Sequence, residues 1–305
     1  MDVKRILVDL DPTRDEQPAL ERAIKLAQTF GASLDLLLVV YNSHLMNNNL
    51  FSEAQLKKAQ QAYLHSQQRW LDTYSEQVNQ QGIQVTSEVC WHKPVYEAIN
   101  EKALALGSDW VVKSTHRHPT INKLLFTPND WQLLKTCPVP LLLVKQSADY
   151  SDYQHILAAI DPSSHNKPVQ LNRIILKNTI ELTEIMHTQP HAAHCFESIG
   201  QDLWSQIKSH AYDNNASGFE YDDYIQNLEQ TNRQEFHKLL SHYPIDEKRQ
   251  HLKFGTAYEQ LPKIVNEHHI DLMVIGTTYR TGLIGSTAER ILDDIHCDLL
   301  ALKSE

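Results

Sequence analysis

The chain carries the same succession of motifs twice, and this duplication limits its fold more than any other feature of the sequence. ILVDLDPTRDEQPAL, which begins at residue 6, resembles ILAAIDPSSHNKPVQL, which begins at residue 156. Asp11 and Pro12 of the first segment recur at a constant offset as Asp161 and Pro162 of the second. SDWVVKSTHRH and LLKTCPVPLLLVK then recur in the same order as IDLMVIGTTYR and ILDDIHCDLLALK. Three matches in one order indicate a tandem duplication.

The duplication predicts two domains joined by a polar linker. We place the first domain at residues 1–146 and the second at residues 154–305, with QSADYSDYQ between their cores. Each half alternates strand and helix patterns, which predicts an α/β fold with a parallel sheet covered by helices on both faces. In such sheets, ligands bind outside the carboxyl ends of the strands.

The first half shows the alternation most clearly. A short apolar strand at residues 5–10 precedes a helix, DEQPALERAIKLAQTFG, that Gly31 ends. Thr127, the first residue of the segment TPNDWQLLKT, is in the position of a helix N-cap, with proline directly after it. A long helix is predicted by apolar residues that share one helical face, namely Leu56, Ala59, Tyr63, Trp70, Tyr74 and Val78.

Composition excludes several classes of protein. The formal net charge of −10 argues against a nucleic-acid-binding surface. No apolar run approaches the roughly 18 to 20 residues that span a bilayer, and no export signal is recognisable, so we expect a cytoplasmic protein without membrane insertion. The four cysteines are far apart and form no CxxC pair, which predicts reduced thiols.

Several of these segments together resemble the universal stress protein family, in its tandem-domain type. The resemblance is carried by ILVDLDP, ILAAIDP, FTPNDWQLLKTCPVPLLLVK, GTTYRTG and GSTAERILDDIHCDLLALK, and it covers nearly the whole chain. It implies a Rossmann-like, five-stranded parallel sheet in each domain and a cytoplasmic role in stress. It also implies that domains pair through their last strands, PLLLV and DLLAL. We expect this pairing within the chain, as a pseudo-dimer, or between chains, as a homodimer.

Nucleotide-binding members of the family share a signature of Gly, two residues, Gly, nine residues, Gly, then Ser or Thr. Gly276 and the pair Gly285-Ser286 match it, but Tyr279 occupies the second glycine position. The loop between Tyr279 and Gly285 is four residues short. We therefore expect ATP binding to be weak or absent.

The first half departs further from this signature. Ser114 stands in the place of the first glycine, and Phe126-Thr127 replaces the Gly-Ser pair. Bulky side chains prevent the backbone from approaching phosphate oxygens as glycine allows. We expect no nucleotide in the first domain.

The resemblance places a ligand site in the second domain, with AMP or ATP as the candidate nucleotide. Ser286-Thr-Ala-Glu289 has one full structural explanation as a capping box, and the alternative is that the same helix N-terminus binds an anion with help from Arg280. We expect Gly276→Val to abolish ligand binding and to leave the fold largely intact. The candidate ligand-binding residues are Asp161, Gly276, Thr277, Thr278, Arg280, Gly285, Ser286 and Thr287.

Two other groups of ionisable residues need an explanation. Asp9 stands where the second half has Ala159, so its carboxylate needs a partner or a shifted pKa if the strand is buried. His187, His191 and His194 suggest zinc, but an extended strand would point His191 and His194 to opposite faces. We predict no metal site.

No catalytic constellation is recognisable, so we expect a protein that is not an enzyme. The leading hypothesis is a stress-response protein whose second domain binds a small anionic or nucleotide-like ligand. One alternative is a scaffold without a ligand. Another is a protein that holds an apolar or amphipathic ligand under a lid or surface insertion at residues 196–224.

Overall fold

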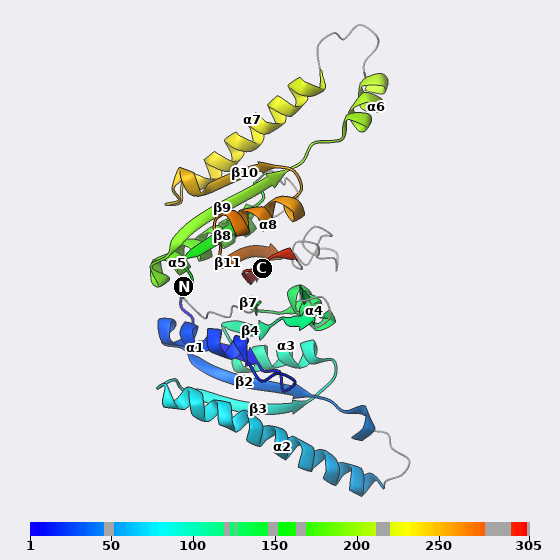
Figure 1. The fold of residues 1–305 in the computed structure, drawn as a ribbon, viewed down its shortest axis with the longest axis vertical. Helices are drawn as coiled ribbons and strands as arrows, with labels where there is room; N and C mark the ends of the chain where they lie inside the picture. The colour runs from blue at the N-terminus through cyan, green and yellow to red at the C-terminus, as the bar shows by residue number, and fades with distance from the viewer. Residues whose placement is uncertain are drawn as a thin grey trace.

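The computed structural model describes residues 1–45, 52–118, 123–125, 127–145, 152–162, 169–211, 220–277 and 294–303. These residues include one ten-stranded sheet with the strand order β10-β9-β8-β11-β12-β7-β4-β1-β2-β3. The five strands of each half are parallel, and the two sets meet antiparallel at β12 and β7. Figure 1 shows a long, curved sheet with one half of the chain at each end. The predicted fold class is confirmed, and the two sheets are continuous with each other.

The strands of the first half are β1 (Arg5–Asp9), β2 (Ser33–Val40), β3 (Val85–Trp91), β4 (Trp110–Ser114) and β7 (Leu141–Val144). Those of the second half are β8 (His155–Ala159), β9 (Gln189–Phe196), β10 (Gln250–Phe254), β11 (Leu272–Thr277) and β12 (Asp298–Lys303). A separate antiparallel pair follows β4 and consists of β5 (His116–His118) and β6 (Lys123–Leu125).

Helices cover both faces of the sheet. Apolar residues of α1, α2, α5 and α7 form one core with alternate strand residues such as Ile6 and Val8. Those of α3, α4 and α8 form the other core, on the face to which Leu7 points. The helices are α1 (Pro18–Phe30), α2 (Glu53–Gln80), α3 (Val95–Leu106), α4 (Pro128–Thr136), α5 (Val169–Met186), α6 (Gln201–Ala211), α7 (Tyr221–Leu240) and α8 (Ala257–Glu267), with short 3-10 turns at Ser43–Leu45 and Glu247–Arg249.

Local sequence signals explain where several helices begin and end. Helix α1 begins at Pro18 and ends at Gly31, which adopts the left-handed conformation with a φ of 67°. The predicted cap of α4 is confirmed as a capping box. The Thr127 hydroxyl accepts from the Asp130 N–H at 3.2 Å, and the Asp130 carboxylate accepts from the Thr127 N–H at 2.7 Å.

The long helix α2 is only partly the amphipathic element that its sequence predicts. Its buried residues are Leu71 and Val78, whereas Ala59 of the predicted face is exposed. Figure 1 shows the reason, because the first turns of α2 extend beyond the end of the sheet. The periodic apolar face therefore predicted the helix, but it did not predict how much of the helix packs against the sheet.

The insertion at residues 196–224 contains α6, which lies beside the first turns of α7 at the far end of the second half (Figure 1). Trp204 of α6 stacks on Tyr224, with the ring centroids 4.6 Å apart. None of the described helices is both long and apolar enough to cross a membrane. All four cysteines are free thiols.

Candidate functional site

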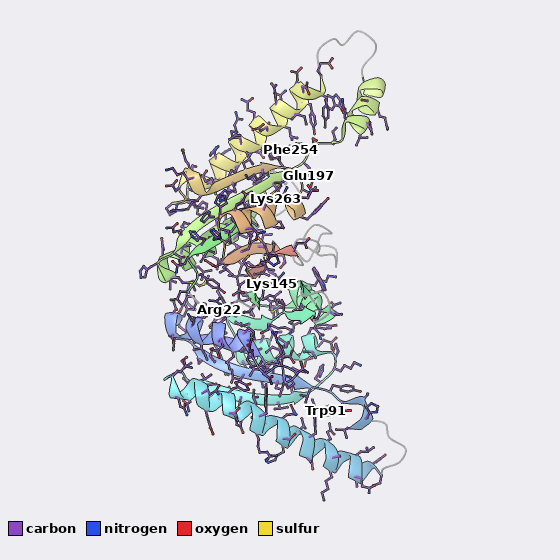
Figure 2. All side chains as sticks on the ribbon, viewed as in Figure 1. Arg22, Trp91, Lys145, Glu197, Phe254 and Lys263 are labelled. Carbon is purple, nitrogen blue, oxygen red and sulfur yellow. The ribbon has the colours of Figure 1, made fainter. Side chains whose placement is uncertain are left out.

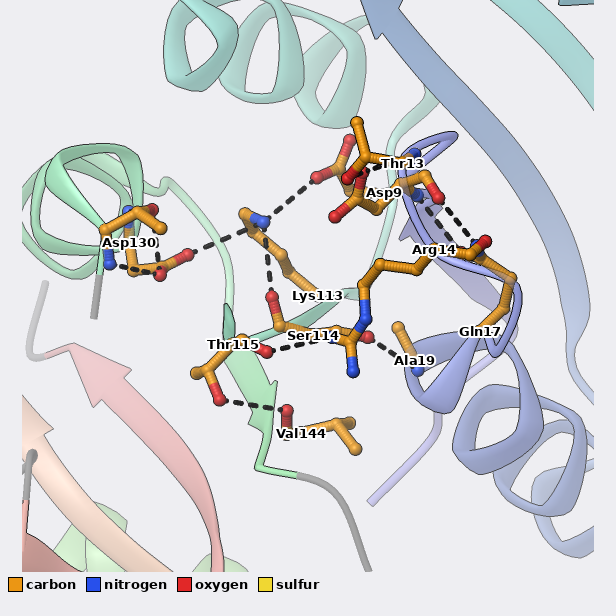
Figure 3. Close-up of polar contacts among 12 residues, drawn as sticks. Asp9, Thr13, Arg14, Gln17, Ala19, Lys113, Ser114, Thr115, Asp130 and Val144 are labelled. Carbon is orange, nitrogen blue, oxygen red and sulfur yellow. Dashed lines mark hydrogen bonds and ion pairs between the residues drawn. The ribbon is translucent and has the colours of Figure 1, made fainter. Parts of the chain in front are cut away.

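The carboxyl ends of β1 and β4 carry a buried group of charges in the first half. The Lys113 ammonium lies 3.4 Å from the Asp9 carboxylate and 3.5 Å from the Asp130 carboxylate (Figure 3). All three side chains are at least nine-tenths buried. Asp9 thus has the partner that its position in a buried strand requires.

Burial and pairing act in opposite directions on these groups. Burial raises the pKa of Asp9 above its ordinary value, and the nearby Lys113 ammonium offsets only part of that effect. Burial alone would lower the pKa of Lys113, but the carboxylates of Asp9 and Asp130 outweigh it, so the pKa is raised. Lys113 is therefore a buried cation at neutral pH.

The rest of this strand end is also occupied by side chains of the first half (Figure 3). The Arg14 guanidinium donates to the Thr115 carbonyl at 3.0 Å, across the end of β4. The Ser114 hydroxyl accepts from the Ala19 N–H at 2.9 Å. One oxygen of Asp11 accepts from both the N–H and the hydroxyl of Thr13, at 2.9 and 2.6 Å, which forms a local turn. These contacts join polar groups of the first half to one another.

The second half repeats one part of this arrangement. In the first half the Gln17 amide accepts from the Asp11 N–H at 3.0 Å and donates to the Asp11 carbonyl at 2.6 Å. In the second half the Asn172 amide does the same for Asp161, at 3.1 and 2.8 Å. A side-chain amide thus holds each aspartate in place after its strand, from the N-cap of α1 in the first half and from the first turn of α5 in the second.

The surroundings of the two aspartates differ. The positions of Asp9 and Lys113 are taken in the second half by Ala159 and Ile275, which are half-buried and apolar. The Asp161 side chain is 36% exposed, and its carboxylate lies 3.9 Å from Nδ1 of His194. The carboxyl ends of β8 and β11 therefore combine an accessible carboxylate with an apolar surface.

Gly276 lies within β11, opposite Leu302 of β12. A Cβ atom at this position would lie 2.6 Å from Cγ and Cδ2 of Leu171 in α5. The glycine therefore lets α5 approach the sheet closely, and a valine would displace a buried leucine. This contact argues against the expectation that Gly276→Val leaves the fold largely intact.

The remaining predicted site residues lie in or after β11. The Thr277 hydroxyl donates to the Leu302 carbonyl at 3.3 Å, as its counterpart Thr115 does to Val144 at 3.4 Å. Thr277 thus has a structural partner between the strands. The residues outside the described part of the chain are Thr278, Arg280, Gly285, Ser286 and Thr287.

His194 and Asn172 are site residues that the sequence analysis did not identify. Asn172 has its counterpart Gln17 at a different spacing from the repeated aspartate, so an ungapped comparison of the halves does not align the two amides. His194 was considered only as a metal ligand. The prediction that His191 and His194 point to opposite faces of β9 is confirmed, because His191 contacts His251 and His194 contacts Asn232.

His191 belongs to a row of histidines near the amino ends of the strands. Its ring nitrogens lie 3.1 Å from the His155 ring and 3.0 Å from the His251 ring. The His251 ring stacks on His268 with a centroid separation of 4.2 Å. Burial, reinforced by the neighbouring rings, lowers the pKa of His191 to about 3 and that of His251 to about 4. Among the described residues, no group of three such side chains has the arrangement of a metal site.

Comparison with known proteins gives a consistent result for both halves. The sequence model of the universal stress protein family matches residues 2–145 and again residues 152–303. The chain is 29% identical to universal stress protein E of Escherichia coli K12, over 99% of this chain and 94% of the relative. It is 30% identical to a universal stress protein E homolog of Haemophilus influenzae, over 99% of this chain and 98% of the relative.

The fold also has a close counterpart among solved structures. A functionally unknown protein from Pseudomonas aeruginosa PAO1 superposes with a TM-score of 0.72 at 22% identity. The match covers 99% of this chain and 92% of the other. At this identity the likeness concerns the fold alone.

Proposed function

Because this chain belongs to the universal stress protein family, we propose that it acts in the stress response as a non-enzymatic tandem binding protein. In this proposal the second domain binds a small anionic or nucleotide-like ligand beside Asp161, and the first domain binds none. The position agrees with the general rule that ligands of parallel α/β sheets lie at the carboxyl ends of the strands.

The contrast between the two strand ends carries this proposal. In the first half, Lys113 fills the space between Asp9 and Asp130, and Arg14 lies across the end of β4. In the second half, half-buried Ala159 and Ile275 take the places of the charged pair. A ligand in the first half would have to displace satisfied buried charges, which costs several kcal/mol by order of magnitude. Among the described residues, Ala159 and Ile275 carry no charge that a ligand beside Asp161 would have to displace.

The proposal specifies the position of the ligand more closely than its chemical identity. A universal stress protein from Archaeoglobus fulgidus has been solved in complex with dAMP, so some members of the family bind a nucleotide. In this chain the shortened loop and Tyr279 favour a smaller ligand than a triphosphate. We expect ATP to bind weakly or not at all, and a sub-micromolar dissociation constant measured by calorimetry would contradict this.

Paired aspartate variants test where a ligand binds. AMP and ATP would be titrated into the full chain, and binding followed by calorimetry and by backbone amide shifts. Asp161→Asn should weaken AMP binding about tenfold or more through loss of a charged acceptor. Asp11→Asn, the matched control at the repeated position, should leave it unchanged. Shifts centred on Asp11 and Ser114 would overturn the assignment to the second domain.

An apolar ligand is the alternative with its own support in the structure. Phe254 is 54% exposed at the end of β10 and contacts Phe196 at the end of β9, with a centroid separation of 5.6 Å (Figure 2). Leu203 of α6 is 49% exposed. Mass spectrometry of ligands extracted from the purified protein would separate the two cases. A co-purified lipid would favour the apolar ligand, and a nucleotide would favour the site at Asp161. If neither is found, the result would favour the scaffold without a ligand.

A further inference from the structure

His194 is enclosed beneath the candidate site. It is 2% exposed, and the centroid of its ring lies 6.3 Å from that of Phe196 and 6.2 Å from that of Phe236. Its Nδ1 lies 3.2 Å from the carbonyl oxygen of Ile160, directly before Asp161. Its Nε2 lies 2.9 Å from Oδ1 of Asn232 in α7. Both ring nitrogens therefore have a hydrogen-bond partner.

Both partners are acceptors. A backbone carbonyl can only accept, which makes Nδ1 a donor. The Asn232 amide is oriented by its nitrogen, which donates to the Leu228 carbonyl at 2.8 Å, so its oxygen faces His194. Turning the amide over would set two oxygens against each other at Leu228. Nε2 is therefore a donor as well, and a ring that donates from both nitrogens is an imidazolium.

A buried cation needs a nearby counter-charge. The Asp161 carboxylate supplies it at 3.9 Å from Nδ1. On the helices of this face, Glu229 pairs with Arg233 on α7, and Glu181 of α5 pairs with Lys177 and with the N-terminal amino group. Within the described ranges, Asp161 is the ionisable side chain in ion-pair contact with His194.

We propose that His194 is a positioning residue, a buried imidazolium that orients the Asp161 carboxylate and keeps it ionised at the candidate ligand site. The consequence for ligand binding rests on the proposed function, whereas the charge on His194 does not. Asp161 held in this way is an acceptor only, so the part of a ligand that faces it carries a hydrogen-bond donor such as a hydroxyl or amino group.

Nitrogen NMR on the full chain tests the charge without any ligand. At neutral pH the wild-type protein should show a directly bonded proton on both Nδ1 and Nε2 of His194, assigned through the backbone. His194→Gln should remove that pair of signals. A single protonated nitrogen in the wild-type protein at neutral pH would overturn the proposal, even if the variant fails to fold.

Two aspartate variants test the coupling. Asp161→Asn, which removes the counter-charge at nearly constant volume, should leave only one bonded proton on the His194 ring at neutral pH, and Asp11→Asn should leave both protons in place. Two bonded protons in Asp161→Asn would contradict the pairing. His194→Gln should weaken AMP binding about tenfold. If AMP binds to neither protein while His194 is doubly protonated, the proposed function fails and the assignment of His194 stands.

Discussion

At the residue scale, one pair of repeat-related positions is occupied by charged residues in the first half and by apolar residues in the second. Asp9 and Lys113 form a buried ion pair in the first half, and the second half has Ala159 and Ile275 at the corresponding places. Buried ion pairs add little net stability, because the cost of desolvation offsets the attraction between the charges. Breaking such a pair by removing one partner is costly, because the other charge stays buried alone.

The first prediction exchanges this pair for the residues of the second half. Lys113→Ile alone should lower the free energy of unfolding by about 3 to 5 kcal/mol, because it leaves Asp9 and Asp130 buried without the cation. Adding Asp9→Ala should restore part of the loss, at least about 1 kcal/mol. Urea unfolding measures both. Losses that simply add in the double variant would show that the two side chains do not act as a pair.

At the scale of elements, the histidine row connects three strands and one helix of the second half. His155, His191 and His251 lie on β8, β9 and β10, and His268 is at the carboxyl end of α8. Burial, with the neighbouring rings and the cations Arg249 and Lys253 as further causes, lowers the pKa of His191 to about 3 and of His251 to about 4. His191 and His251 are therefore neutral in the folded protein at neutral pH.

The second prediction concerns acid. The folded-state pKa values of His191 and His251 are below the ordinary value of 6.5, so the unfolded chain binds more protons between about pH 3 and 6.5. Stability should be full above pH 6.5 and fall by roughly 2 to 4 kcal/mol between pH 7 and pH 5. His251→Gln should reduce this pH dependence, measured by urea unfolding. The exposed His65→Gln serves as control, and an equal reduction there would contradict the role of the row.

At the scale of the whole molecule, the two halves are joined by related contacts on both sides of the β7–β12 pair. The Lys145 ammonium, after β7, donates to the Ile295 carbonyl at 2.9 Å. The Lys303 ammonium, at the end of β12, donates to the Cys137 carbonyl at 2.6 Å. Cys137 and Ile295 are repeat-related positions, so each half uses its last lysine to contact the other.

Asp298 makes this junction asymmetric. Its carboxylate accepts from the Tyr153 hydroxyl at 2.7 Å and from the Lys145 N–H at 3.0 Å, and it pairs with Arg22 of α1 at 3.1 Å. Arg22 also stacks over the Tyr153 ring, 4.2 Å from its centroid. Figure 2 shows Arg22 and Lys145 near the middle of the molecule, where the halves meet. The Asp298 carboxylate of the second half thus contacts both Arg22 of the first half and Tyr153 of the linker.

The third prediction is that this network makes the two halves unfold together. Asp298→Ala should cost about 3 to 5 kcal/mol, because Arg22 is buried and loses its anionic partner. Calorimetry should then show a broader or divided transition. Asp152→Asn, which removes only the exposed pair with Lys25, should change stability by less than about 1 kcal/mol. A single unaltered transition in Asp298→Ala would contradict the prediction.

The edges of the sheet bear on self-association. β7 lies between β4 and β12, and β12 lies between β7 and β11, so the last strands are interior. The edges of the described sheet are β3 and β10. A homodimer stays a prediction that analytical ultracentrifugation of the full chain would test.

The sequence alone determined the features that depend on neighbours along the chain. Repeated motifs and alternating patterns identified two α/β halves with parallel strands, and Thr127 followed by Pro128 identified a helix cap. The two-residue period of a strand placed His191 and His194 on opposite faces. Each of these follows from backbone geometry within a few residues, which periodicity and capping rules describe well.

Only the tertiary structure decided which distant side chains meet. It set Lys113 beside Asp9, Leu171 against the bare backbone of Gly276, and His194 beneath Asp161. The family resemblance implied that the last strands pair, and the structure set the antiparallel register in which β7 and β12 join the two sheets into one. These contacts depend on how helices and strands from separate parts of the chain pack together, and close packing makes them specific to this arrangement. A local sequence pattern does not specify which distant residue packs against it.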